Sequence, residues 1–363
     1  MNTFGKTIGL TIFGESHGLS IGAVLDGLPS GEAIDWDAVR AEMARRAPGK
    51  NQMSTARSEK DAFEVQSGFF NGYTTGTPLC AIIRNSDQHS RDYDQLRHLM
   101  RPGHADYSGK IRYGGFNDYR GGGHFSGRLT APLVFAGAVA SQILARHGIT
   151  VGSHILRLAG IADKPFTAIG ETAETLQALK KETLPVLDKA QSGLMEEKIL
   201  AAKNDLDSVG GVIECMVTGL PAGIGDPFFD SVESQLSHMM FSVPAVKGIE
   251  FGDGFSLAEL RGSQANDAFY YDGDVVKTRT NHNGGINGGI TNGMPVVFRL
   301  AIKPTASISQ KQETIDTDTK ENCDLVIKGR HDPCIVQRAI PVVEAAAAWA
   351  ILDVCLSEKG RCW

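Results

Sequence analysis

The feature that most constrains the fold is an apolar run of seventeen residues, LTAPLVFAGAVASQILA, at positions 129–145. It is slightly short for a helix that crosses a bilayer, and it contains the polar residues Thr130, Ser141 and Gln142. Basic groups bound it on both sides. We therefore predict a helix over residues 130–147 that is ended by Gly148, lies in a protein core and makes no membrane contact.

Three further segments have helical patterns. Residues 341–356, PVVEAAAAWAILDVCL, begin with Pro341 at a favoured first helical position, and their alanine run suits close helix packing. Residues 35–49 have Asp35 as a candidate cap, a shared apolar face and a Pro-Gly stop. Residues 192–208 predict a helix with a charged face.

Segments with alternating apolar residues predict strands between these helices. They cover residues 6–15, 21–28, 78–85, 212–219 and 296–304. The glycine-rich connections resemble hairpins more than crossovers, so we predict an α+β fold rather than a doubly wound sheet.

The sequence contains one weak repeat. Residues 23–31, AVLDGLPSG, and residues 215–223, CMVTGLPAG, each consist of a predicted strand that ends in Gly-Leu-Pro-x-Gly. Two similar halves packed together explain this repeat, and chance explains it nearly as well. No linker rich in Pro, Ser or charge is visible. We predict one domain over residues 1–363, with a duplication into halves of about 1–190 and 191–363 as a hypothesis.

The net charge of −6 argues against nucleic acid as the main partner. Residues 91–128 nevertheless contain seven Lys and Arg against four Asp and Glu, a local charge of +3 in an otherwise acidic chain. This basic window fits a small anionic substrate better than a polymer.

Cysteine and histidine spacing argues against a metal site. The six cysteines form no C-x-x-C pair, which suits reduced thiols in a cytosol, and the histidines form no H-E-x-x-H motif. The opening MNTFGKTIGL lacks the apolar stretch of a signal peptide. We expect a cytoplasmic protein without a bound metal.

GESHG at 14–18 places Ser16 and His17 on a sharp turn after a strand. It is not a nucleophile elbow, because Ser16 lacks the glycine frame and no helix follows. A catalytic histidine and a turn histidine bonded to the backbone are both open at this point.

RPGHADYS at 101–108 offers Arg101, which can hold a phosphate or carboxylate bidentately, and His104, which can deliver a proton near neutral pH. The alternative is a surface loop turned by Pro102 and Gly103.

Three further segments, two rich in glycine and one rich in charged residues, are candidate binding or catalytic sites. RGGGHFSGR at 120–128 can cradle an anion with successive backbone N–H groups, and it matches neither the Walker nor the dinucleotide pattern. NHNGGINGGITNG at 281–293 is either an ordinary loop or a site where a flat ring lies on bare backbone. GRHDP at 329–333 is either functional or an ion pair that caps the following helix.

These motifs, together with GLPAGIGDPFFD, AVKGIEFGDGF and KPTAS, stand in an order along nearly the whole chain that resembles chorismate synthases. The resemblance implies a β-α-β sandwich built from two similar halves, and a homotetramer. It implies that 5-enolpyruvylshikimate 3-phosphate is converted to chorismate and phosphate by an anti 1,4-elimination, the last common step towards the aromatic amino acids. Reduced FMN is required although there is no net redox change.

The resemblance also implies roles for single residues. His17 would protonate the reduced flavin at its N1/O2 edge, His104 would protonate the departing phosphate, and Asp332 would act on flavin N5, which accepts the C6 hydrogen. Ser16, Arg46, Arg101 and Arg128 would contact the substrate. The implied cofactor contacts are His124, Phe125, Ser126, Ala245, Gly288, Lys303, Pro304, Thr305, Ala306, Ser307 and Arg330.

Some positions depart from the family pattern. His124 and Phe125 replace Arg and Ser, Leu129 replaces Glu, and Gln52 and Pro244 also differ. The catalytic positions are intact, which favours the family's reaction, whereas the altered GGGHFSGRL segment motivates the alternative of a non-catalytic flavin-binding protein on the same fold. Because no added reductase domain is visible, we expect a separate flavin reductase to supply reduced FMN, with NADPH only as an indirect reductant.

Overall fold

Two antiparallel sheets form the outer layers of the fold. The computed structural model describes residues 1–49, 52–54, 61–85, 96–327 and 331–357. The first sheet has the order β1-β2-β3-β7-β4, with β1 Thr3–Phe4, β2 Gly9–Gly14, β3 Ser20–Asp26, β4 Phe63–Ser67 and β7 Leu79–Arg84. The second has the order β11-β16-β10-β8-β9, with β8 Thr150–Leu158, β9 Ile161–Ala162, β10 Gly211–Thr218, β11 Val246–Phe251 and β16 Val296–Ile302.

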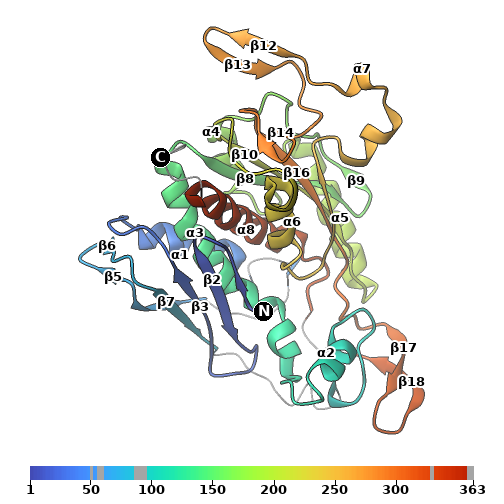
Figure 1. Cartoon of the computed structure of the whole chain (residues 1–363). Helices are drawn as coiled ribbons and strands as arrows, with labels where there is room; N and C mark the ends of the chain where they lie inside the picture. Colours follow the sequence, from blue (N-terminus) through green and yellow to red (C-terminus); the bar gives the residue numbers. More distant parts are fainter. Residues whose placement is uncertain (50–51, 55–60, 86–95, 328–330, 358–363) are drawn as a thin grey trace.

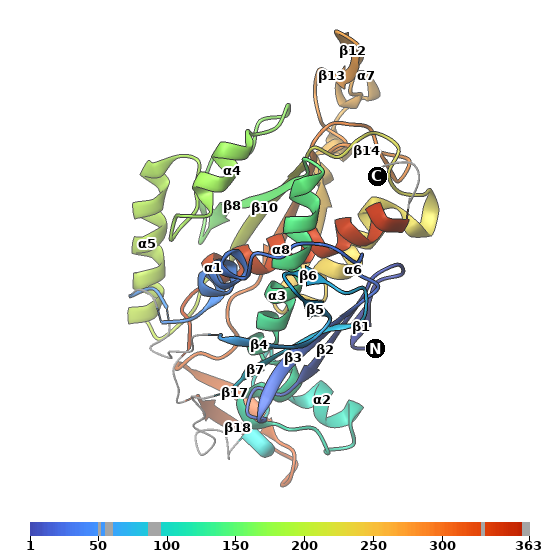
Figure 2. The same cartoon turned by 90° about the vertical axis from the view of Figure 1, so that its left-hand side faces the viewer.

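A layer of helices lies between the sheets (Figures 1 and 2). It contains α1 Trp36–Arg46, α3 Thr130–Arg146, α6 Val232–Met240 and α8 Val336–Ser357. Helix α3 contacts β2, β3 and β7 of the first sheet, whereas α8 contacts β8 and β10 of the second, and the two helices contact each other. The predicted β-α-β sandwich is confirmed. Helices α4 Ala173–Leu179 and α5 Lys189–Asn204 pack on the second sheet at β8 and β9.

The remaining elements are small and lie outside this sandwich. Short hairpins are formed by β5 Phe69–Phe70 with β6 Tyr73–Thr74, β12 Phe269–Asp272 with β13 Val275–Thr278, β14 Ile286–Asn287 with β15 Ile290–Thr291, and β17 Lys311–Asp316 with β18 Glu321–Val326. The β12–β13 hairpin and α7 Gly262–Ala265 project from the body at the top of Figure 1. Helix α2 Asp106–Arg112 lies beside β17–β18 at the opposite end, where Lys110 Nζ donates to Thr317 Oγ1 at 2.6 Å. Short 3-10 turns are η2 Arg120–Phe125, η3 Gly127–Leu129, η4 Phe228–Asp230 and η5 Gly254–Glu259.

Helices α3 and α8 approach closely because small residues face each other. A Cβ added to Gly137 of α3 would lie only 2.2 Å from Cα of Ala345 in α8. Two segments, Gly127–Arg146 and Val336–Ser357, are apolar and long enough to cross a bilayer, but 83% and 100% of their most apolar windows are buried inside the protein. Both the core helix predicted over 130–147 and the close packing predicted for the alanine run are confirmed.

The last helix differs from its predicted start. It begins at Val336, and Pro341 lies inside it rather than at its first position. The added turn buries Val336, Ala339 and Ile340, and this burial offsets the backbone hydrogen bond that proline removes. The helices predicted over 35–49 and 192–208 correspond to α1 and α5, with α5 starting and ending three to four residues earlier than predicted, whereas α2, α4, α6 and α7 were not predicted. Asp35 caps α1 by accepting from the backbone N–H of Asp37 at 2.8 Å.

The two repeat segments have equivalent places, because β3 and β10 are the central strands of their respective sheets. In both segments the glycines of Gly-Leu-Pro-x-Gly have positive φ, which L-residues adopt rarely. The boundary near residue 190 stays a prediction; β8 and β9 precede it and pair within the second sheet.

A buried ion cluster joins strands of the second sheet. His154 on β8 is fully buried, with Nδ1 at 3.0 Å from Asp163 Oδ2 and Nε2 at 2.9 Å from Glu214 Oε2. Burial alone would lower the pKa of His154, but hydrogen bonds to the two carboxylates raise it. Arg299 Nε on β16 donates to Glu214 Oε1 at 2.8 Å, so the cluster links β8, β10 and β16.

Candidate functional site

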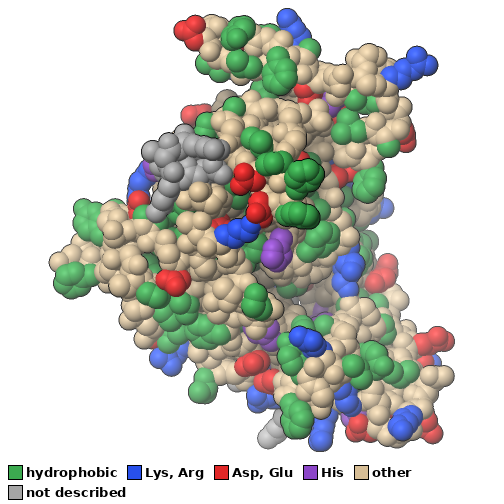
Figure 3. Space-filling view, in the orientation of Figure 1, with side chains coloured by type: hydrophobic (Ala, Val, Ile, Leu, Met, Phe, Trp, Pro, Cys, Tyr) green, Lys and Arg blue, Asp and Glu red, His purple; other side chains and the backbone are tan. Residues whose placement is uncertain are grey.

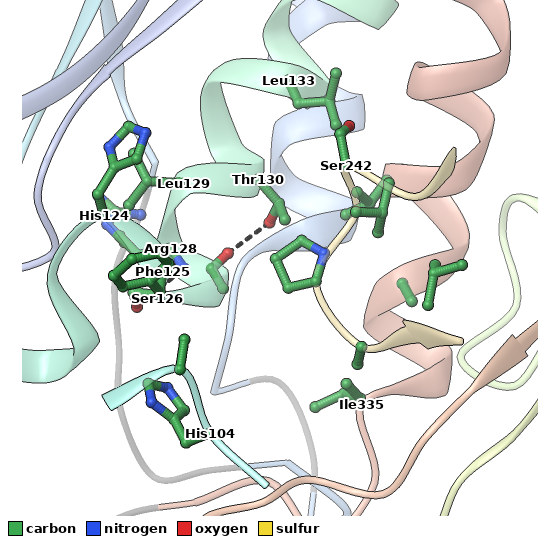
Figure 4. Close-up of a pocket in the computed structure, with 18 of the residues that line it drawn as sticks. His104, His124, Phe125, Ser126, Arg128, Leu129, Thr130, Leu133, Ser242 and Ile335 are labelled. Carbon is green, nitrogen blue, oxygen red and sulfur yellow. Dashed lines mark hydrogen bonds between the residues drawn. The ribbon is translucent and has the colours of Figure 1, made fainter. Parts of the chain in front are cut away.

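A cavity of about 840 Å³ lies where the helical layer meets α2 and the loop that precedes α3. Its walls come from segments far apart in the sequence, at residues 101–105, 121–133, 238–247, 303–307 and 331–342. Figure 3 shows this face, which is hollowed beside the lobe that carries α2, with histidine side chains in the hollow. In Figure 4, His104 lies across from Phe125, Ser126 and Arg128, and Ser242 and Ile335 lie on the other side.

The triple glycine separates the two histidines that sequence motifs singled out. Gly121, Gly122 and Gly123 have φ values of +61°, +86° and +54°. A Cβ on Gly121 would lie 2.4 Å from Cδ2 of His17, and one on Gly122 would lie 3.3 Å from Cε1 of His104. The sequence predicted an anion beside these glycines, but side chains of the protein itself lie beside two of them.

His104 is oriented by a carboxylate. Its Nδ1 lies 2.6 Å from Asp106 Oδ1, and Arg101 binds the same carboxylate through Nε at 2.7 Å and Nη2 at 2.8 Å. Because a carboxylate only accepts, Nδ1 carries a hydrogen and Nε2 is the nitrogen left to exchange a proton. Arg101 Nη1 also donates to Ser307 Oγ at 3.2 Å. Arg101 and Asp106 are buried, so this motif is not the surface loop of the alternative interpretation.

The Asp106 carboxyl group is ionised at neutral pH because its neighbours lower its pKa. Burial alone would raise the pKa, but hydrogen bonds from Arg101 and His104, together with their charges, hold the pKa of Asp106 well below its usual range. The carboxylate is therefore negative at neutral pH and accepts hydrogen bonds from both Arg101 and His104.

The GESHG turn is joined to the glycine loop by backbone groups. Ser16 N donates to Gly123 O at 3.1 Å, and His124 Nδ1 lies 2.8 Å from Gly14 O. Ser16 and His17 are buried, and Ser16 Oγ has no hydrogen-bond partner among the described residues. The two motifs therefore form one unit at the end of β2.

Two of the predicted substrate-binding arginines share a carboxylate that sequence reasoning missed. Arg46 Nε donates to Asp61 Oδ2 at 2.7 Å, and Arg128 Nη1 binds Asp61 Oδ1. All three side chains are buried. Both arginines line the cavity, so their side chains are fixed in its wall by Asp61. No motif surrounds Asp61 in the sequence, and only the fold brings it between the arginines.

The GRHDP turn is tied to the first turn of α8. Asp332 forms an ion pair with Arg338 Nη1, and Arg338 Nε donates to Arg46 O at 3.2 Å. Burial lowers the pKa of Arg338, while Asp332 opposes this shift. Arg338 lines the cavity and was not predicted. The ion pair at the helix start that the sequence left as an alternative does form, and it lies in the cavity wall.

His331 is a second cavity residue that sequence reasoning did not select. Its Nε2 is buried and has no hydrogen-bond partner among the described residues. Burial first, and then the charge of Arg101, lower the pKa of His331 to about 4, while Asp332 acts in the opposite direction.

Phe125 forms a wall of the cavity by packing on α2. A Cβ added to Gly109 would lie 2.5 Å from Cε2 of Phe125, and the ring centroid of Tyr113 is 6.2 Å away. The glycine in α2 therefore makes room for the aromatic residue that departs from the family pattern.

Most of the predicted site residues line this one cavity. They are Arg46, Arg101, His104, His124, Phe125, Ser126, Arg128, Ala245, Lys303, Pro304, Thr305, Ala306, Ser307 and Asp332. Ser16 and His17 lie behind Gly121, which lines it.

Two predicted cofactor contacts are not among these residues. Gly288 lies in the turn between β14 and β15 and has a φ of +63°, a backbone conformation that favours glycine over other residues. Arg330 lies outside the described residues. Within the part of the chain that the structure describes, no group of three or more His, Cys, Asp or Glu side chains is placed to hold a metal ion.

Comparison with known proteins gives a consistent result over the full length. Residues 8–356 match the chorismate synthase family. Chorismate synthase of Dehalococcoides mccartyi is 45% identical over 355 residues, which cover 98% of this chain and 96% of the relative. Chorismate synthase of Methanosarcina mazei is 43% identical over 352 residues, covering 97% and 95%. A crystal structure of chorismate synthase superposes with a TM-score of 0.75 at 27% identity, covering 99% of this chain and 95% of that one.

Proposed function

Because this chain belongs to the chorismate synthase family, whose members are phosphate lyases, we propose that it converts 5-enolpyruvylshikimate 3-phosphate into chorismate by an anti 1,4-elimination. The C6–H and C3–O bonds break, the ring double bond shifts and a second ring double bond forms, and inorganic phosphate leaves with the electrons of the C3–O bond. The observation that supports this most directly is the glycine loop, which packs on His17 at Gly121 and on His104 at Gly122 beside a cavity lined by several arginines.

The cavity suits reduced FMN, the cofactor that this family uses. Its volume of about 840 Å³ is at the upper end of ordinary ligand sites, which favours two ligands bound together. Thr305 lines the cavity and its Oγ1 is buried without a partner among the described residues, so a bound group can satisfy it. Lys303, Pro304 and Thr305 would contact the flavin, with Ala245 from the facing segment. When bound, reduced FMN would supply an electron-rich ring with N5 as the acceptor for the hydrogen that leaves C6.

His104 is the proposed acid for the departing phosphate. Asp106 accepts from Nδ1, so the proton to be transferred is held at Nε2. Arg101, anchored by two bonds to Asp106, keeps a fixed guanidinium beside His104 and balances phosphate charge. Arg46 and Arg128, which line the cavity and are held by Asp61, are the proposed contacts for a second anionic group of the substrate.

His17 and Asp332 are proposed to manage protons at the flavin. His17 is buried beside Gly121, where it can hold a proton for an anionic ring edge. Asp332 shares its charge with Arg338, which fixes the carboxylate against the start of α8 as it acts at N5. Water is excluded from His17 by the turn that buries it, which strengthens its electrostatic interactions.

The surrounding arrangement follows from the same proposal. We expect a cytoplasmic homotetramer that receives reduced FMN from a separate flavin reductase, with NADPH as an indirect reductant only. Light scattering tests the tetramer. Gly288 and Arg330 stay predicted cofactor contacts. Activity that survives EDTA separates this reaction from that of a metal-dependent phosphate hydrolase.

The deciding test is anaerobic phosphate release. Purified protein with dithionite-reduced FMN should release phosphate from 5-enolpyruvylshikimate 3-phosphate and form chorismate in equal amount. Flavin that is demonstrably bound, with no phosphate released, would refute the reaction and favour the non-catalytic flavin-binding alternative. His17→Ala should retain flavin and lose turnover.

A further inference from the structure

His331 differs from the other histidines near the cavity in having an unpaired buried nitrogen. His104 Nδ1 bonds Asp106, and His124 Nδ1 contacts Gly14 O at 2.8 Å. His331 Nε2 is buried in the cavity wall and has no hydrogen-bond partner among the described residues. The roles assigned above to the cavity residues do not use it.

An unpaired buried polar atom destabilises a protein that contains no ligand. Folding removes water from Nε2 without supplying a replacement hydrogen bond. An apolar side chain of similar size at this position would therefore make the ligand-free protein more stable than histidine does. Because the atom belongs to the wall of a ligand-sized cavity, a bound molecule is the available source of its missing partner.

The charges around His331 indicate which ligand atom fits. Arg101 and Asp332 are the charged groups that act on it, and the effects of burial and Arg101 keep the imidazole neutral near pH 7. A neutral imidazole can donate one N–H. An anionic oxygen placed here can accept a hydrogen bond from the imidazole N–H of His331 and can also pair with the guanidinium of Arg101.

We propose that His331 is a substrate-positioning residue, whose Nε2–H donates a hydrogen bond to an anionic oxygen of the substrate that Arg101 also binds. This inference rests on the proposed function for the identity of the substrate. The hydrogen bond is directional and adds no further positive charge to a site that already contains several arginines, so it orients the substrate anion between Arg101 and the Asp332 turn.

A pH effect follows from this placement. An anion beside the ring offsets the influence of Arg101 and raises the pKa of His331 from about 4, the value for the ligand-free protein. Substrate binding then takes up protons between the free and the bound pKa. Affinity for the substrate therefore rises as pH falls through that interval, and this part of the pH dependence disappears when His331 is replaced.

The experiment compares His331→Leu, which removes the donor, with His331→Gln, which retains an N–H at similar reach. Calorimetry with 5-enolpyruvylshikimate 3-phosphate on the protein loaded with oxidised FMN measures substrate affinity without turnover. We expect His331→Leu to lose about 10-fold or more in substrate affinity and His331→Gln to recover most of it. The melting temperature of ligand-free His331→Leu should stay level or rise, FMN affinity should change less than about twofold, and the pH slope of substrate binding should flatten.

His238→Leu is the matched control, since His238 also lines the cavity but packs its ring on Phe4 at 5.0 Å. It should leave the pH slope unchanged. Unaltered substrate affinity in His331→Leu would overturn the proposal, and so would equal losses of FMN and substrate affinity or a lower melting temperature. Wild-type protein that binds substrate but releases no phosphate with reduced FMN refutes the reaction instead, and leaves the comparison of binding valid.

Discussion

Replacing Gly121 by alanine tests whether the glycine loop positions the two histidines. The added Cβ would lie 2.4 Å from His17 Cδ2, 2.5 Å from its Nε2 and 3.0 Å from Ser16 Oγ. Ordinary carbon contacts begin near 3.5 Å, so the imidazole must move by about 1 Å or the loop must shift by as much.

Two effects with different magnitudes follow. The φ of +61° at Gly121 is unfavourable for alanine and costs about 1 kcal/mol of stability. Displacing a catalytic group by about 1 Å costs about 100-fold in turnover, equivalent to about 2.7 kcal/mol of barrier. The loss of activity should therefore clearly exceed the loss of stability.

Gly115→Ala provides the matched control, because Gly115 also has positive φ, at +80°, but has no atom within 4 Å of an added Cβ. It should lower stability by a similar amount and leave turnover unchanged. Gly122→Ala should fall between them, since its Cβ would lie 3.3 Å from His104 Cε1.

The assay is anaerobic phosphate release under substrate saturation, with thermal unfolding measured on the same preparations. Wild-type turnover in Gly121→Ala would refute the reasoning. So would a Gly115→Ala protein that loses as much activity as Gly121→Ala, because strain alone would then explain both losses.

Three other perturbations have definite expected outcomes. Asp106→Asn should reduce turnover by about 10²–10⁴-fold with little change in FMN affinity, since an amide has no negative charge and one accepting oxygen where the carboxylate uses two to hold His104 and Arg101; unchanged kcat in steady-state kinetics contradicts this. Asp61→Asn should destabilise the protein by about 3 kcal/mol in urea unfolding, because it leaves two buried arginines without their shared carboxylate; a loss under about 1 kcal/mol argues against it. The raised pKa of His154 gives a stability contribution that is complete below about pH 6.5 and is lost as pH rises through the folded-state pKa. Melting temperatures across this range should fall in the wild type and vary less in His154→Gln; parallel curves would contradict the assignment.

Secondary structure was predictable wherever the pattern was local and strong. The apolar run at 129–145 and the alternation at 296–304 became α3 and β16, because a helix or strand with one dominant period has few alternatives. Pro341 misled the prediction of the α8 start. Proline is favoured in a first turn, yet the apolar residues before it gain more from burial than one lost backbone hydrogen bond costs.

The glycine loop shows what a motif leaves open. Three consecutive glycines predicted a close approach to bare backbone, and the approach exists. Its partners, His17 and His104, come from two other segments, and no local pattern could distinguish them from a bound cofactor.

The sequence by itself determined the family, the sandwich of helices and strands and most of the residues that line the cavity, because these depend on short-range periodicity and on motifs in a fixed order. Only the tertiary structure decided the partners of the charged groups. Asp61 meets Arg46 and Arg128, Arg338 meets Asp332, and Nε2 of His331 has no partner within the described part of the chain. The physical reason is that electrostatic and hydrogen-bond energies depend on distances of a few ångströms and on the exclusion of water, which packing of the two sheets on the helical layer sets.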